Sequence, residues 1–131
     1  MNIKIIFLLL CTVTLSGCPR VAYIDIYNNT FSAFLIDSHG EKYSVKPNQS
    51  VRLTLGYSWQ IESELGTWIY ERNVPDGGAE GKFFDGTLVV QVNTDGKIYV
   101  AKKGDELPLS IVGYEQPEGY PLLPNSKLNR N

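Results

Sequence analysis

The feature that most constrains the fold is a series of short segments, rich in β-branched and aromatic residues, that recur about every ten residues from residue 21 onward. Residues that favour turns, mainly glycine, asparagine, aspartate and proline, separate these segments. The stretch SVRLTL, residues 50–55, alternates apolar and polar residues with the period of two that a half-buried strand requires. No amphipathic helical period runs longer than a turn or two. The sequence therefore predicts an all-β domain, a small antiparallel β-sandwich or barrel of about seven strands.

The expected strands lie at 21–27, 31–37, 41–45, 50–55, 57–63, 66–74, 87–93 and 97–102. The last two form the clearest predicted hairpin, because Asp95-Gly96 between them suits the positive φ angles of a type I′ turn. Trp59 and Trp68 lie on the two strands that flank a short turn, so that they can meet across this pair.

The first twenty residues, MNIKIIFLLLCTVTLSGCPR, have the order of a secretory signal: Lys4, an apolar run over 5–15, and small residues before Cys18. The apolar run has about half of the roughly 20 residues that a membrane-spanning helix needs. We therefore expect export rather than a membrane span. The four residues Leu-Ser-Gly-Cys at 15–18, at the end of this apolar run, resemble the lipobox of bacterial lipoproteins.

This resemblance implies that residues 1–17 are removed as a signal peptide, and that a diacylglyceryl group is joined to the Cys18 thiol. It also implies that the new amino terminus is acylated, for example with palmitate. Two or three acyl chains hold a protein firmly on a membrane, whereas one holds only marginally. Cys11, the other cysteine, would leave with the signal, so we expect no disulfide.

The residue after the lipidated cysteine bears on location. In many enterobacterial lipoproteins an aspartate there marks retention in the inner membrane, whereas this chain has Pro19. By resemblance to those proteins, we expect the outer membrane in a diderm host, facing the periplasm or the surface. In a monoderm host we expect the outer face of the cytoplasmic membrane.

The mature chain divides into a lipidated cysteine with a short tether at 18–20, a β domain at 21–104, and a proline-rich extended segment at 105–131. Residues 109–114 of that segment can add one edge strand, and we expect disorder over 126–131. Tyr114, Tyr120 and Leu122 either pack back on the domain or enter a groove of a partner. Packing on their own sheet is the favoured interpretation.

The chain offers little that indicates catalysis. His39 is its only histidine, and Asp37 and Ser38 precede it directly in a predicted turn, so that their side chains diverge rather than form a catalytic triad. Phosphate-binding, GxSxG and HExxH motifs are absent from the sequence. We therefore predict no enzyme, no catalytic residues, no metal site and no cofactor other than the lipid.

Two groups of carboxylates leave alternatives open. Glu62 and Glu64 can share a strand face, and Asp76 and Glu80 share a loop, so that a glycoside-cleaving pair is an alternative without specific support. The glycine-rich loop 75–86 also invites a calcium site. It lacks the alternating oxygen ligands of an EF-hand, and we expect a flexible connection there instead.

The predicted function is that of a non-enzymatic, lipid-anchored envelope protein that binds another envelope protein. Such a protein acts as a complex subunit, an accessory factor, or an inhibitor or immunity factor. Nucleic acid is excluded as a partner, because the net charge is −2 and no basic patch with interleaved aromatics is present. The alternative is a domain for a small envelope ligand, such as a glycan or peptidoglycan fragment, that stacks on Trp59 and Trp68. For these two residues, packing in the core is the favoured interpretation.

Overall fold

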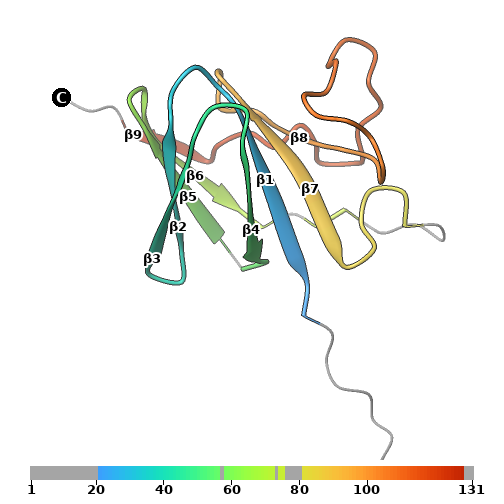
Figure 1. Cartoon of the computed structure of the whole chain (residues 1–131), viewed down its shortest axis with the longest axis horizontal. Helices are drawn as coiled ribbons and strands as arrows, with labels where there is room; N and C mark the ends of the chain where they lie inside the picture. The colour runs from blue at the N-terminus through green and yellow to red at the C-terminus, as the bar shows by residue number, and fades with distance from the viewer. Residues whose placement is uncertain (1–20, 57, 73, 76–80, 129–131) are drawn as a thin grey trace, which may run out of the picture.

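The computed structural model describes residues 21–56, 58–72, 74–75 and 81–128. Cys18 and the signal region lie outside these residues. Within them every regular element is a β-strand, and the predicted all-β sandwich is confirmed (Figure 1). Nine strands are described, against about seven predicted: β1 (Tyr23–Asn29), β2 (Phe34–Ser38), β3 (Glu41–Val45), β4 (Ser50–Thr54), β5 (Ser58–Ser63), β6 (Gly66–Glu71), β7 (Thr87–Asn93), β8 (Ile98–Val100) and β9 (Ser126–Leu128).

The strands form two sheets that pack face to face. One sheet has the order β4-β1-β7-β8, and the other has the order β3-β2-β5-β6-β9. The prediction of antiparallel pairing holds for every named pair except β1 and β7, which run parallel. A parallel pair requires a long crossover. Here the chain supplies one by passing through β2 to β6 before it returns to lie beside β1.

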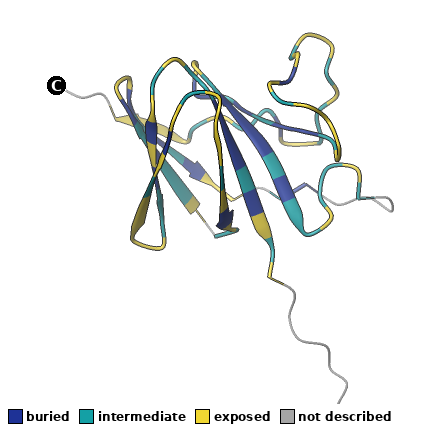
Figure 2. Ribbon diagram, viewed as in Figure 1, coloured by how far each residue is buried: buried dark blue, intermediate teal, exposed yellow. Residues whose placement is uncertain are grey.

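The core lies between the two sheets and follows the period-two pattern of the sequence. Along β1 and β7, buried residues alternate with more exposed ones over the first four positions, and the next two positions are buried as well (Figure 2). From one sheet, Ile26 and Val90 are 1% and 0% exposed, and from the other, Ile36 and Ile61 are both 0% exposed. Each fully buried aliphatic side chain of this size contributes about 1.5–3 kcal/mol to folding.

The tryptophans pack in or against this core, which agrees with the favoured interpretation. They do not lie opposite each other on the two strands, as the sequence suggested. Trp59 lies opposite Tyr70 in the β5–β6 register, with ring centroids 5.3 Å apart, and Trp68 lies opposite Ile61. Trp68 is 2% exposed, whereas Trp59 is half-buried. The register of the short β5–β6 hairpin is what moves the two indoles out of direct opposition.

The hairpin of β7 and β8 is confirmed, but its turn is not type I′. Only Gly96 in the loop has a positive φ, of 80°. Its N–H donates to the Asn93 carbonyl at 2.9 Å, and the Asn93 N–H donates to the Lys97 carbonyl at 3.0 Å. This is the three-residue loop in which a left-handed glycine follows a type I turn. Glycine is required, because a Cβ at this position would lie 3.0 Å from the Trp68 ring.

The carboxyl-terminal segment packs on its own domain, as the favoured interpretation held. Ile98 of β8 and Leu122 exchange backbone hydrogen bonds of 3.0 and 2.8 Å. The Gln116 side chain imitates a neighbouring strand, because its amide accepts from the Val100 N–H and donates to the Val100 carbonyl, both at 2.8 Å. The segment thereby covers the open edge of β8, which would otherwise be free to pair with another chain.

Two predictions about this segment are wrong. Residues 109–114 contain a turn at 112–113 and no strand, with Leu109 buried and Val112 96% exposed. Of the residues predicted to be disordered, Ser126–Leu128 form β9 and pair with β6, and 129–131 lie outside the described residues. All three β9 residues are exposed, so the strand is held by its backbone pairing and has no apolar face that a sequence pattern could reveal.

Candidate functional site

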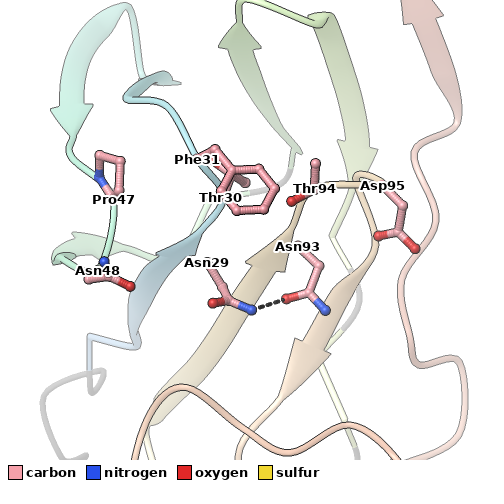
Figure 3. A pocket seen from close by; sticks show the side chains of 8 residues that line it. All are labelled: Asn29, Thr30, Phe31, Pro47, Asn48, Asn93, Thr94 and Asp95. Carbon is pink, nitrogen blue, oxygen red and sulfur yellow. Dashed lines mark hydrogen bonds between the residues drawn. The ribbon is translucent and has the colours of Figure 1, made fainter.

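A pocket of about 630 Å³ lies at the end of the sandwich where β1 and β7 finish. We call this end the tip. Three connections build it: β1 to β2, β3 to β4, and β7 to β8. Figure 3 shows the residues that line it, which are Asn29, Thr30, Phe31, Pro47, Asn48, Asn93, Thr94 and Asp95.

The parallel pairing of β1 and β7 is what assembles the tip. In its register Asn29 lies beside Asn93, and each is the last residue of its strand. A threonine follows in both cases, so that the dipeptides Asn29-Thr30 and Asn93-Thr94 leave the sheet next to each other. Two strands that end at one edge therefore bring the same pair of residue types together twice, although the Thr30 hydroxyl lies within hydrogen-bond distance of Oδ1 of Asn28, at 2.7 Å, and of the Ser32 carbonyl, at 2.8 Å.

Buried groups fix the orientation of the two strand-end amides. The backbone N–H of Leu109 donates to Oε1 of Gln91 at 2.6 Å, and Gln91 is fully buried. Because an N–H can only donate, the other end of the Gln91 amide is its Nε2, which donates to Oδ1 of Asn93 at 2.8 Å. Nδ2 of Asn29 donates to the same oxygen at 2.9 Å (Figure 3).

This series of hydrogen bonds leaves one polar atom of Asn93 and one of Asn29 available at the tip. Nδ2 of Asn93 can donate, and Oδ1 of Asn29 can accept. No hydrogen bond to either atom occurs within residues 21–56, 58–72, 74–75 and 81–128. The tip thus presents an oriented donor and an oriented acceptor on adjacent strands.

A second buried amide holds the other two loops in place. Nδ2 of Asn28, which is fully buried, donates to the carbonyls of Val45 at 2.8 Å and Ser32 at 2.9 Å. Its Oδ1 accepts from the Thr30 N–H at 2.9 Å, and its own carbonyl accepts from the Asn48 N–H at 2.8 Å. The loops are therefore preorganised, which lowers the entropic cost of binding a ligand.

The tip is almost uncharged and carries one bare aromatic ring. Phe31 is 92% exposed. Asp95 is the one charged residue of the lining, and it is engaged by Lys97, whose backbone N–H donates to it at 3.0 Å and whose Nζ lies 3.6 Å away. The chemistry on offer is therefore polar, neutral hydrogen bonding beside an apolar surface.

The tryptophans predicted as alternative stacking surfaces do not lie at the tip. Trp68 has no exposed ring face, because it is enclosed between the sheets and lies under Gly96. Trp59 is half-buried against Tyr70. Cys18, the predicted lipidation site, lies outside the described residues.

The three residues named as candidate partner contacts make contacts that hold the carboxyl-terminal segment on its own domain. The Tyr114 hydroxyl accepts from the Lys102 N–H at 2.7 Å and donates to Asp105. Burial and the bond to Asp105 raise the pKa of Tyr114 to about 12. Tyr120 is 9% exposed, and burial raises the pKa of its hydroxyl as well. Leu122 is the residue that pairs with β8.

The carboxylates considered for catalysis are dispersed. Glu62 lies on β5, where Lys42 approaches it at 3.0 Å, and Glu64 lies in the turn after β5, off the strand face. Asp76 and Glu80 fall outside the described residues, and Asp85 forms an ion pair with Lys103. In the part of the chain that the structure describes, no three histidine, cysteine, aspartate or glutamate side chains are grouped to hold a metal ion.

Among the described residues, there is no helix that is long and apolar enough to cross a bilayer.

Sequence reasoning missed the tip altogether. Asparagine was considered there only as a residue type that favours turns, and the threonines were given no role. The signal that was present is the repeated Asn-Thr dipeptide after two β-rich segments, but its meaning depends on the parallel pairing. Comparison with known proteins adds no analogy, since no protein-family model, no curated protein and no solved structure matches the chain.

Proposed function

We propose that this chain is a lipid-anchored, non-enzymatic recognition module of the cell envelope, which binds another envelope component through its tip. The observation that carries the proposal is the preorganised pocket with the bare Phe31 ring, at the end of the sandwich opposite the end where the chain enters it. A rigid scaffold that presents a few loops in fixed positions is the usual setting for a binding site.

The position of the tip suits an anchored protein. β1 begins at Tyr23, close in sequence to Cys18, and ends at Asn29 in the tip (Figure 1). Seven strand residues span about 20 Å at 3.3 Å per residue. If Cys18 carries lipid, the short tether keeps the start of β1 near the bilayer, and the tip faces away from it. The proposed location is the outer membrane of a diderm host, or the outer face of the membrane of a monoderm host.

A protein is the partner proposed from the sequence: a subunit of an envelope complex, or the target of an accessory, inhibitory or immunity factor. Exposed aromatic side chains on rigid loops are typical anchors of protein interfaces. Phe31 is such a side chain, and the amides around it can supply a polar rim. A small envelope ligand is the second candidate partner. The oriented amides of the tip favour the tip, rather than the tryptophans, as the place where such a ligand would bind.

The proposal is tested by crosslinking the tagged, lipidated protein in cells and identifying what it captures. Cys18→Ala serves as the unanchored variant, and it should also release the protein from the membrane fraction. Phe31→Ala tests the tip, and Val112→Ala is its matched control, because Val112 is 96% exposed but does not line the tip.

The expected result is one dominant captured component that is lost with Cys18→Ala and Phe31→Ala and retained with Val112→Ala. Capture that is equal for all four proteins would contradict recognition at the tip. A Cys18→Ala protein that remains tightly bound to membranes would contradict the lipid anchor.

A further inference from the structure

We propose that the tip pocket binds a neutral saccharide, with the Asn29 and Asn93 amides hydrogen-bonded to adjacent hydroxyls and the Phe31 ring against the sugar face. This inference rests on the proposed function, because it takes recognition at the tip as given and names the chemistry of its second candidate, a small envelope ligand. It follows from the hydrogen-bonding groups that the fold leaves available, the exposed ring and the near-absence of charge.

The amides match a pair of neighbouring hydroxyls. Each sugar hydroxyl can donate one hydrogen bond and accept others. Oδ1 of Asn29 is available as an acceptor and Nδ2 of Asn93 as a donor, and the two side chains are joined by their own 2.9 Å hydrogen bond. One hydroxyl can therefore donate to Asn29 while its neighbour accepts from Asn93. The orientation of both amides is set from the interior by Gln91, so it exists before the ligand arrives.

The aromatic ring supplies the apolar part of the site. A pyranose has a face of C–H groups with partial positive charge, and the face of a phenyl ring is negative. Phe31 lines the same pocket as the amides and is 92% exposed, so its ring is open to such a contact (Figure 3). A small polar ligand without a C–H face could bond to the amides but would make no favourable contact with the Phe31 ring.

The charge of the tip argues for a neutral ligand. The lining contains no lysine, arginine or histidine. An anionic ligand such as a phosphate or a uronic acid would find no cationic side chain in the lining for the charge-assisted bonds that such groups require, and Lys97 is already paired with Asp95. A volume of about 630 Å³ falls within the range of small-molecule sites, and suits one or two sugar rings rather than a long chain.

The test measures saccharide binding by the full lipidated protein in phospholipid nanodiscs, which contain no sugar detergent. The probes are neutral tetrasaccharides of glucose, mannose and N-acetylglucosamine, with tetragalacturonate as the anionic probe. Titration calorimetry and chemical-shift changes at the tip report binding. The expected result is measurable affinity for at least one neutral probe and none for the anionic probe.

Asn93→Asp is the most informative variant. Its remaining Oδ1 still accepts from Gln91 and Asn29, so the fold is kept, but the outward donor becomes a carboxylate oxygen. We expect affinity to fall about tenfold, the effect of one lost hydrogen bond in a binding site. Asn125→Asp is the matched control, because it makes the same change of charge at an exposed asparagine outside the pocket.

Phe31→Ala should also weaken binding about tenfold or more, and Val112→Ala should leave it unchanged. The saccharide proposal is overturned if no neutral probe binds at millimolar concentration, if tetragalacturonate binds best, or if Asn93→Asp binds as well as Asn125→Asp. Should a protein still be captured in cells through Phe31 while no saccharide binds, recognition at the tip stands and the saccharide proposal fails.

Discussion

The tip and the carboxyl-terminal segment are both built from irregular chain, yet they treat their polar groups in opposite ways. In the segment, Gln116 makes two bonds to Val100, and the Tyr114 hydroxyl bonds to Lys102 and Asp105. At the tip, Asn29 and Asn93 bond to each other and keep one donor and one acceptor available. The comparison indicates that the segment serves stability, whereas the tip serves recognition.

The largest effect is expected when one aromatic ring is removed from each region. Tyr120→Ala should lower the free energy of unfolding by about 3 kcal/mol, because it leaves a cavity beside the core. Phe31→Ala should change it by less than about 0.5 kcal/mol, because the ring is exposed. Urea unfolding followed by circular dichroism measures both. Equal losses for the two variants would show that the tip also contributes to stability.

Gln91 connects the two regions, and its loss should affect both. Gln91→Leu removes the acceptor of the Leu109 N–H and the donor that orients Asn93. We expect a loss of about 2 kcal/mol in the free energy of unfolding, because a buried N–H is left without a partner. Chemical shifts of the Asn29 and Asn93 side-chain amides should also change. A stable variant with unchanged amide shifts would contradict the orienting role of Gln91.

A smaller effect is expected for the side chain that covers the edge of β8. Gln116→Ala removes both hydrogen bonds to Val100, and we expect a loss of about 1 kcal/mol. Hydrogen exchange at the Val100 N–H should become faster, while exchange in β1 should stay unchanged. Glu118→Ala, at an exposed neighbour in the same segment, is the control. Unchanged protection of Val100 would mean that the segment is held without this contact.

The sequence predicted the strands well because their signal is local. The bounds of β3 and β7 agree with the predicted 41–45 and 87–93, and each pattern is contained within its own segment. The parallel pairing of β1 and β7 was missed, because it joins residues about sixty positions apart and leaves no mark on either strand. β9 was missed for a related reason. Its residues are exposed, and they form a strand through backbone pairing with β6, which is distant in sequence.

The tip could not be predicted for the same reason as the parallel pair. Asn29 and Asn93 each resemble an ordinary strand end, and they become a site only when their strands end side by side. The orientation of their amides depends further on Leu109, which lies in a segment without regular structure. Local patterns therefore predicted the scaffold, whereas the candidate site arises from contacts between distant parts of the chain.

The smallest expected effect concerns the ionic attachment of the segment. Glu115 accepts from Lys82 at 2.6 Å and lies 2.9 Å from Nζ of Lys102, and these two contacts lower its pKa to about 2. A carboxyl whose pKa is lowered by folding stabilises the fold above its ordinary pKa of 4.5, and this contribution disappears as the pH falls toward 2. The contribution is small, since all three groups are solvent-exposed or nearly so.

An NMR titration of the Glu115 carboxyl measures this pKa directly. Lys82→Gln and Lys102→Gln should each move it toward 4.5, with the larger change for Lys82, whose hydrogen bond is the larger cause of the shift. Lys97→Gln, which removes the ion pair with Asp95 at the tip, should leave it unchanged. A wild-type pKa near 4.5 would mean that the two lysines do not hold Glu115 in solution. In that case the attachment of the segment depends on Gln116, Tyr120 and the pairing of Leu122 with β8, and the contrast with the tip rests on those neutral contacts alone.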